Sequence, residues 1–257
     1  MHFQWYPGHM TKAKRMMQEN IKLIDLVIEL VDARVPISSR NPDIDELGKN
    51  KARLILLNKS DLAEDKWNDA WSEYFREKGF SVVKVNSKKG GGIKSINGVI
   101  QEACKEKIER DRKRGILNRP VRAMVVGIPN VGKSSFINRM AQSKRAKVED
   151  RPGVTRNKQW VKIGDNMELL DMPGVLWPKF DDQEVAKRLA FTGAIHDDIM
   201  DLESLAMLLL EYLAQHYPEA LQARYKMQEA QLQGDGLQLL EQLGRNRGML
   251  ISGGEVN

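Results

Sequence analysis

The sequence predicts an α/β fold with a doubly wound, mostly parallel sheet, followed by a small all-helical C-terminal region. Short apolar runs rich in Val, Ile and Leu alternate with helical stretches over the first 180 residues. After Phe180 the chain becomes acidic and helical. Alternation of this kind is typical of parallel sheets covered by helices. The length of 257 residues accommodates one large and one smaller domain, expected at residues 1–180 and 181–257.

Four buried parallel strands are expected where the apolar runs are shortest and most β-branched or leucine-rich. They are Leu26–Val31, Leu54–Leu57, Ser81–Val85 and Val121–Val126. Helical stretches lie between or after them, at Lys66–Lys78, Ile93–Lys107, Ser135–Ala141 and Leu202–His216. A hairpin around Gly164-Asp165-Asn166 is expected to join strands Gln159–Ile163 and Met167–Leu170. Residues 105–120 form a charged connector.

Composition and charge exclude several classes of protein. Hydrophobic residues make up 41% and charged residues 30%, a balance that argues against disorder. No apolar run approaches the roughly 18 residues needed to cross a bilayer, so no membrane role is expected. The single cysteine, Cys104, fits a reducing compartment and hence the cytoplasm.

The net charge of +6 is unevenly distributed along the chain. Residues 1–180 carry 35 Lys and Arg against 22 Asp and Glu, a net charge of +13. Residues 181–257 carry 6 against 13, a net charge of −7. The basic excess indicates a polyanionic partner such as RNA. A basic surface that serves only solubility is the alternative.

The first motif that carries chemistry is a phosphate-binding loop. Gly127-Ile128-Pro129-Asn130-Val131-Gly132-Lys133-Ser134 matches GxxxxGK(S/T) and lies between an expected strand and an expected helix. Backbone N–H groups of such a loop surround phosphates, and the helix start adds partial positive charge. We expect Asn130, Val131, Gly132, Lys133, Ser134 and Ser135 to line the phosphates. Lys133 would reach the β- and γ-phosphates, and the Ser134 hydroxyl would ligate Mg²⁺.

A second motif selects the base. Asn58-Lys59-Ser60-Asp61 matches NKxD at the end of an expected strand. The Asp61 carboxylate can accept hydrogen bonds from the ring N–H and exocyclic amine of guanine, a pair that adenine does not offer. Asn58 would tie loops together, and the Lys59 stem would cover the base. The Ser87 backbone N–H is expected to reach the guanine oxygen.

A third motif completes a GTPase set. Asp171-Met172-Pro173-Gly174 matches DxxG and follows the strand-like run Met167–Leu170. Asp171 would hold the shell of Mg²⁺, and the Gly174 N–H would sense the γ-phosphate. Thr155 is the only threonine between the phosphate loop and DxxG, and it would clasp Mg²⁺ and γ-phosphate in the triphosphate state. An ordinary loop threonine is the alternative.

The order of these motifs predicts a circular permutation. Ordinary small GTPases carry the phosphate loop first and NKxD late, whereas here residue 58 precedes residue 127. Residues 105–120 would bridge the former chain ends, and the C-terminal helices follow DxxG directly. A segment that responds to γ-phosphate would then reorient a whole domain, which favours a switch over a metabolic enzyme. A P-loop kinase or ATPase is the alternative that NKxD argues against.

The chain resembles the ribosome biogenesis GTPase A family, the YlqF-type circularly permuted GTPases. The likeness covers most of the chain and is carried by Gln4–Met10, Val31–Arg34, Ser38–Pro42 and Asp171–Lys179. It implies a cytoplasmic GTPase with a low intrinsic rate, GTP or GDP as nucleotide and Mg²⁺. It also implies a role in assembly of the large ribosomal subunit, contact with rRNA, and activation by the particle. Family members are expected to continue past a stretch like Ser252-Gly253-Gly254, whereas this sequence ends at Asn257.

The hydrolytic group is the least determined part of the site. Ras-like enzymes carry a water-orienting glutamine just after DxxG, where this chain has Val175 and Leu176. His9, in a Pro-Gly turn before a basic segment, is the candidate for orienting water, or else it packs or contacts RNA. In similar GTPases with such hydrophobic replacements, an asparagine at the position of Asn130 helps to bind K⁺. A role as a turn-former is the alternative.

Two sets of basic residues are the candidate RNA contacts. The first is Lys12, Lys14, Arg15 and Lys22, and the second is Arg110, Arg112, Lys113 and Arg114 of the connector. We expect a protein that is monomeric away from the ribosome. A signalling switch that acts on a protein effector is the competing function, although no lipidation motif supports it.

Overall fold

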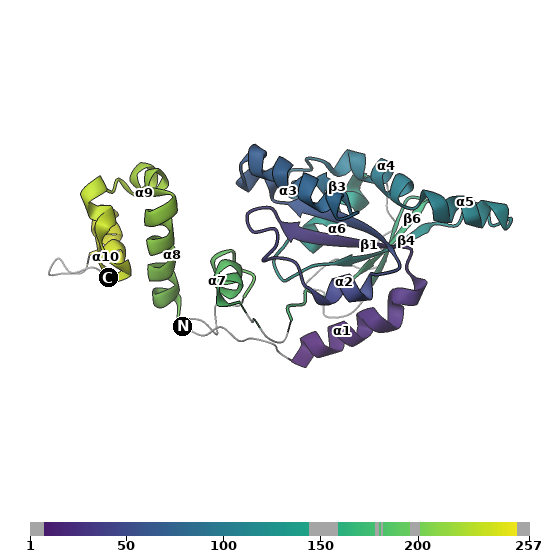
Figure 1. Cartoon of the computed structure of the whole chain (residues 1–257), viewed down its shortest axis with the longest axis horizontal. Coiled ribbons are helices and arrows are strands. Elements are labelled where there is room, and N and C mark those ends of the chain that lie inside the picture. Colours follow the sequence, from purple (N-terminus) through teal and green to yellow (C-terminus); the bar gives the residue numbers. More distant parts are fainter. Residues whose placement is uncertain (1–7, 144–158, 178–179, 181, 196–200, 251–257) are drawn as a thin grey trace. The chain divides into compact units, whose positions relative to one another are not determined.

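The computed structural model describes residues 8–143, 159–177, 180, 182–195 and 201–250. The chain divides into two compact units between Leu189 and Ala190 (Figure 1). Helix α7 (Gln183–Phe191) spans this division. The expected assignment of residues 1–180 and 181–257 to two domains therefore stays a prediction.

A six-stranded sheet forms the centre of the first unit, in the order β3-β2-β1-β4-β6-β5. All neighbouring strands are parallel except β5 and β6, which form the expected antiparallel hairpin. The doubly wound, mostly parallel sheet is thus confirmed. The strands are β1 (Leu26–Asp32), β2 (Ala52–Asn58), β3 (Ser81–Lys84), β4 (Val121–Val126), β5 (Gln159–Ile163) and β6 (Met167–Asp171).

The central strands are apolar because both of their faces are covered. All seven residues of β1 are buried, and so are the last five of β2. Fully buried aromatic rings pack on this core from two helices, Phe75 of α3 and Phe136 of α6. Continuous Val, Ile and Leu runs are what a sheet buried on both faces requires, which explains why the strands could be found from sequence.

Helices cover the sheet in Figure 1. One expected helix, Ile93–Lys107, is broken at Cys104, where the N–H bonds back to Ile100 and a new helix starts at Lys105. The first-unit helices are α1 (Gly8–Asn20), α2 (Asp43–Leu47), α3 (Asp65–Glu77), α4 (Ile93–Ala103), α5 (Lys105–Lys113) and α6 (Lys133–Ser143). Short 3-10 helices span Ile21–Leu23 and Ser60–Leu62.

The strand order confirms the circular permutation. The strand that ends in NKxD, β2, comes before the strand that leads to the phosphate loop, β4, along the chain, yet both flank β1 in one sheet. Helices α4 and α5 carry the chain from edge strand β3 to the centrally placed β4. The expected connector at residues 105–120 therefore begins as helix α5, in which no side chain is buried.

The second unit is a set of helices around a small leucine-rich core. Its helices are α8 (Leu202–His216), α9 (Pro218–Tyr225) and α10 (Gly236–Asn246), with a 3-10 helix at Glu229–Gln233. Asp201 and Asp235 cap the starts of α8 and α10. Their carboxylates accept hydrogen bonds from the Ser204 and Gln238 N–H groups, which would otherwise have no partner within the helix. Across the described part of the chain, no helix combines the length and apolarity that a membrane crossing requires.

Candidate functional site

The predicted motifs converge on one edge of the sheet. Asp32, Asn58, Lys84, Val126 and Asp171 end five strands that run parallel to one another. Carboxyl ends of parallel strands share an edge, and ligands of open α/β sheets bind there. Sequence positions more than 100 residues apart are thereby brought together.

The phosphate loop links β4 to helix α6 and has the backbone that such a loop needs. Asn130 adopts the left-handed conformation at φ +56°, and Gly132 has φ +101°. A side chain on Gly132 would collide with the Asn58 amide, so this position requires glycine. Helix α6 begins at Lys133, which places the helix N-terminus directly after the loop.

Lys133 is buried within the phosphate loop. Its Nζ donates to the carbonyl oxygens of Gly127 at 3.1 Å and Ile128 at 3.0 Å. Burial lowers the pKa of Lys133 to about 8, and the negative charge of Asp171 opposes this shift. An ammonium group desolvated in this way gains strongly from a bound anion. The arrangement suits a phosphate that lies over the loop.

Asn58 joins the phosphate loop to the loop after β3. Its Nδ2 donates to the Val131 carbonyl at 2.7 Å. Its Oδ1 accepts from the Ser87 N–H at 3.1 Å and from the Ser87 hydroxyl at 2.9 Å. Both side chains are buried, so these bonds are shielded from water. One amide therefore sets the spacing between the expected phosphate-binding and base-binding loops.

Lys59 is held in place by a network that the motif alone does not reveal. Lys59 has φ +58°, and its Nζ lies 2.9 Å from Asp32 Oδ2. Arg34 binds the same carboxylate through Nε at 2.9 Å and a terminal nitrogen at 2.7 Å. Burial raises the pKa of Asp32, but hydrogen bonds from Arg34 and Lys59 outweigh it and hold the pKa below its ordinary value. Asp32 therefore acts as an ionised anchor.

Asp61 and Ser87, two of the groups expected to bind the base, both make contacts within the protein. Asp61 lies in the 3-10 helix Ser60–Leu62, with Lys89 Nζ 3.6 Å from its carboxylate. The Ser87 N–H, expected to reach a guanine oxygen, donates to Asn58 instead. Its contribution to base binding stays a prediction.

The DxxG motif lies against the phosphate loop. Asp171 is buried at the end of β6, paired in register with Val125 of β4. A Cβ on Gly174 would come within 2.9 Å of the Pro129 backbone and 3.0 Å of Lys133 Nζ. Glycine is therefore required at 174 by close approach rather than by its own φ. This contact places the Gly174 backbone against the phosphate loop, and its role in sensing the γ-phosphate stays a prediction.

The donor set fits a magnesium ion beside a nucleotide. The Ser134 hydroxyl and the Asp171 carboxylate are hard oxygen ligands on adjoining elements, and Mg²⁺ binds through one or two such groups plus phosphates. Thr155, the third expected contributor, lies outside the described residues. His9 belongs to helix α1, but its side chain also lies outside what the structure describes.

The family resemblance includes Asp32 and Arg34, but the sequence analysis gave them no role in this site, because no nucleotide motif contains them. The usable signal was topological. Asp32 ends β1, and its register partner in β2 is Asn58, the first residue of NKxD. An acidic residue at the carboxyl end of a strand next to the NKxD strand is therefore in reach of the motif lysine.

Two of the expected RNA contacts on α1 are engaged within the protein. Lys14 Nζ pairs with Asp43 at 2.8 Å, and Arg15 Nε pairs with Glu19 at 3.0 Å. Lys12 and Lys22 are exposed and have no ion pair among the described residues. The four expected RNA contacts of the connector, Arg110, Arg112, Lys113 and Arg114, are likewise exposed.

Comparison with known proteins shows the same combination of features. The family described as "50S ribosome-binding GTPase" matches residues 122–233, which include the phosphate loop and DxxG. The chain is 50% identical to ribosome biogenesis GTPase A of Bacillus cereus, over all of this chain and 86% of that protein. It is 48% identical to the Bacillus licheniformis protein of the same name, over all of this chain and 90% of that protein.

Solved structures share the fold. A GDP-bound structure of TM YlqF has a TM-score of 0.66 and 24% identity, over 95% of this chain and 88% of that one. The GNP-bound YlqF from Thermotoga maritima has a TM-score of 0.62 and 24% identity, over 96% of this chain and 88% of that one.

Proposed function

Because the chain belongs to the ribosome biogenesis GTPase A family and is a GTPase, we propose that it is a GTP-dependent assembly factor for the large ribosomal subunit. The observation that supports this most is the Asn58 amide, which joins the phosphate loop to the base-binding loops. That junction couples recognition of guanine to recognition of the phosphates. A GTP-dependent factor needs the guanine and the phosphates to be bound in one site, where GTP and GDP then differ only at the terminal phosphate.

Nucleotide binding is divided among the loops that follow the strands at this edge of the sheet. Asp61 reads the guanine, Lys59 covers the base, and Asp32 with Arg34 keeps Lys59 in position. Backbone N–H groups of residues 130–135 and the Lys133 ammonium bind the phosphates. Ser134, Thr155 and Asp171 hold Mg²⁺, which supplies charge neutralisation at the β- and γ-phosphate oxygens when bound.

Hydrolysis depends on a group outside DxxG. Val175 and Leu176, which stand where Ras-like enzymes carry glutamine, are both buried and apolar. Intrinsic turnover is therefore slow, and His9 orients the attacking water once the ribosomal particle positions α1. Asn130, on the exposed rim of the phosphate loop, helps to bind K⁺, which adds positive charge near the reacting phosphates.

Ribosomal RNA is the proposed polyanion, and the protein acts in the cytoplasm. The supporting observation is the +13 charge of residues 1–180, against −7 in residues 181–257. The exposed connector residues Arg110, Arg112, Lys113 and Arg114, with Lys12 of α1 and Lys22 of the next 3-10 helix, are better placed to meet phosphates than Lys14 and Arg15, which form internal ion pairs. Mutation of one such contact weakens binding modestly and reduces its salt dependence.

The test is GTP turnover with and without purified large subunits, in K⁺ and in Na⁺ buffer. Wild type is compared with His9→Ala. We expect large subunits to raise wild-type turnover by roughly tenfold or more, and His9→Ala to remove that gain. K⁺ should stimulate turnover relative to Na⁺ at equal ionic strength.

Three results would change the proposal. If large subunits leave turnover unchanged while GTP binds tightly, a switch acting on a protein effector becomes the better function. If His9→Ala retains full stimulation, His9 packs or contacts RNA instead. If ATP competes as well as GTP for the site, the guanine assignment of Asp61 is wrong.

A further inference from the structure

A short segment between β1 and α2, residues 38–43, is held rigidly against the sheet. Arg40 binds buried Glu29 at 2.9 Å and Asp45 at 2.6 Å. Buried Ser39 accepts the Asp32 N–H at 2.9 Å and donates to the Pro36 carbonyl at 3.1 Å. The Arg40–Glu29 pair and the two Ser39 hydrogen bonds are shielded from water and therefore resist displacement. The segment is therefore a fixed platform beside the nucleotide site.

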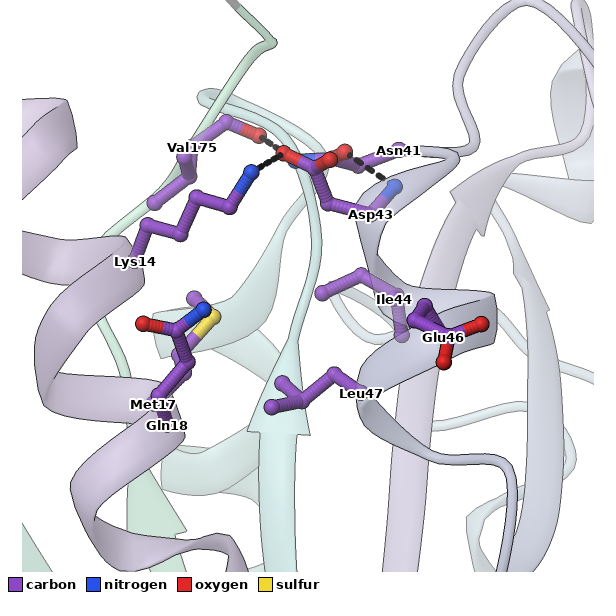
Figure 2. Close-up of a pocket in the computed structure, with 9 residues that line it drawn as sticks. All are labelled: Lys14, Met17, Gln18, Asn41, Asp43, Ile44, Glu46, Leu47 and Val175. Carbon is purple, nitrogen blue, oxygen red and sulfur yellow. Dashed lines mark hydrogen bonds and ion pairs between the residues drawn. The ribbon is translucent and has the colours of Figure 1, made fainter.

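One side chain reaches from this platform to the DxxG region. Asn41 is 4% exposed, and its Nδ2 donates to the Val175 carbonyl at 3.2 Å. Its Oδ1 accepts from the Asp43 N–H at 3.0 Å, which fixes the direction of the amide. Figure 2 shows Asn41 between Val175 and Asp43, with both bonds drawn.

The backbone bonds that hold the DxxG region are long. The Val175 N–H bonds to the Gly127 carbonyl at 3.3 Å, and the Met172 N–H bonds to the Val125 carbonyl at 3.3 Å. Bonds of this length lie beyond the usual range for N–H···O pairs and are correspondingly weak. The Asn41 amide, at 3.2 Å from the Val175 carbonyl, therefore adds a third bond of similar length to the two that hold this stretch of main chain.

Packing alone does not fix Val175 from the other side. A pocket of about 200 Å³ lies between α1, α2 and Val175. Its lining includes Met17, Ile44 and Leu47 as well as Val175, which lies at the upper end of the pocket in Figure 2. Val175 borders this pocket and so has fewer protein atoms packed against it on that side, where the Asn41 hydrogen bond adds a polar tether.

We propose that Asn41 is a positioning residue that fixes the Gly174–Val175 backbone for discrimination between GTP and GDP. The inference rests on the proposed role of the Gly174 N–H in sensing the γ-phosphate. Gly174 lies so close to Pro129 that a Cβ would come within 2.9 Å of its backbone. A small displacement of Val175 therefore moves the Gly174 N–H away from the terminal phosphate, while contacts to the base and to the other phosphates stay in place.

The same platform is connected to helix α1. Asp43, whose N–H is bound by Asn41, pairs through its carboxylate with Lys14 at 2.8 Å. Asn41 and the Lys14–Asp43 pair thus form a continuous chain of contacts from Val175 to α1, the helix that contains His9. The contacts of Asn41 and Asp43 therefore help to position both the Gly174 N–H, the proposed γ-phosphate sensor, and helix α1.

The test compares affinities for GDP and for a non-hydrolysable GTP analogue in Asn41→Ser. Serine retains an oxygen that can accept the Asp43 N–H, but it is too short to reach the Val175 carbonyl. We expect affinity for the GTP analogue to fall about threefold to tenfold, with GDP affinity changed by less than about twofold. Asn41→Asp, which also retains the acceptor and loses the donor, is the second variant should Asn41→Ser fold poorly.

Controls separate this role from general destabilisation. Ser39→Ala removes two hydrogen bonds within the same platform without touching Val175, so it should leave the ratio of GTP-analogue affinity to GDP affinity unchanged. Gly174→Ala, like Asn41→Ser, should lower the affinity for the GTP analogue relative to the affinity for GDP. An unchanged ratio in Asn41→Ser and Asn41→Asp, or an equal loss for both nucleotides, would overturn the proposal. Failure of the assembly-factor function would appear separately, as wild-type turnover that large subunits do not stimulate.

Discussion

Replacement of Asn58 by alanine tests the junction on which the nucleotide site depends. Asn58 makes three hydrogen bonds, of 2.7 Å to Val131 and of 3.1 and 2.9 Å to Ser87, and it is 2% exposed. At about 0.5–1.5 kcal/mol for each bond, Asn58→Ala should reduce the free energy of unfolding by about 1.5–4.5 kcal/mol. Affinities for GDP and GTP should fall by the same factor, because the junction positions loops that both nucleotides use.

Tryptophan fluorescence provides a selective assay for this loss of stability. All five tryptophans lie between residues 5 and 177, so urea unfolding followed by their emission reports on the first unit and not on the helices after it. A shift of the urea midpoint without a change in slope would identify a loss of stability alone. Nucleotide affinity is measured in parallel with a fluorescent GDP.

A matched variant isolates one of the three bonds. Ser87→Ala removes only the hydroxyl bond to Asn58 and should cost about 0.5–1.5 kcal/mol. In the double variant the two losses should not add, because they share this bond. A change of less than about 0.5 kcal/mol in Asn58→Ala, or fully additive losses, would show that the loops are held together by other contacts.

Three further predictions follow from the site and its surroundings. Asp32→Asn removes the anchor of Lys59, so affinities for GDP and GTP should fall together by about threefold to tenfold in direct binding assays, without a change in their ratio. Gly174→Ala places a Cβ 2.9 Å from the Pro129 backbone, so GTP turnover should fall by roughly tenfold or more while GDP still binds. Cys104 should react slowly with thiol reagents in the native protein and rapidly after unfolding, because burial raises the pKa of the thiol from 9.0 to about 11. Below pH 9 this pKa shift leaves the free energy of unfolding unchanged. As pH rises from 9 toward 11 the thiol ionises in the unfolded chain first, so the free energy of unfolding declines, and Cys104→Ser should flatten that decline.

The sequence alone determined the fold class, the order of the elements and the motifs. Buried parallel strands need continuous apolar runs, and Val121–Val126 was therefore predicted with the bounds that the structure has. Motif order revealed the permutation because it is a property of the chain, independent of packing. Helix ends inside a continuous helical pattern were harder to predict. The break at Cys104 divides a run that reads as one helix, since residues 99–114 around it contain neither proline nor glycine.

The tertiary structure decided which residues support the motifs. Asp32 and Lys59 meet because β1 and β2 end in register, and Asn41 meets Val175 although 134 positions separate them. Lys14 and Arg15 read as free cations in the sequence, but their partners Asp43 and Glu19 reduce the charge they present. Short motifs specify groups that touch a ligand, because that chemistry requires particular residue types at fixed spacing. The residues that hold those groups in place are chosen by proximity in space, which local sequence does not encode.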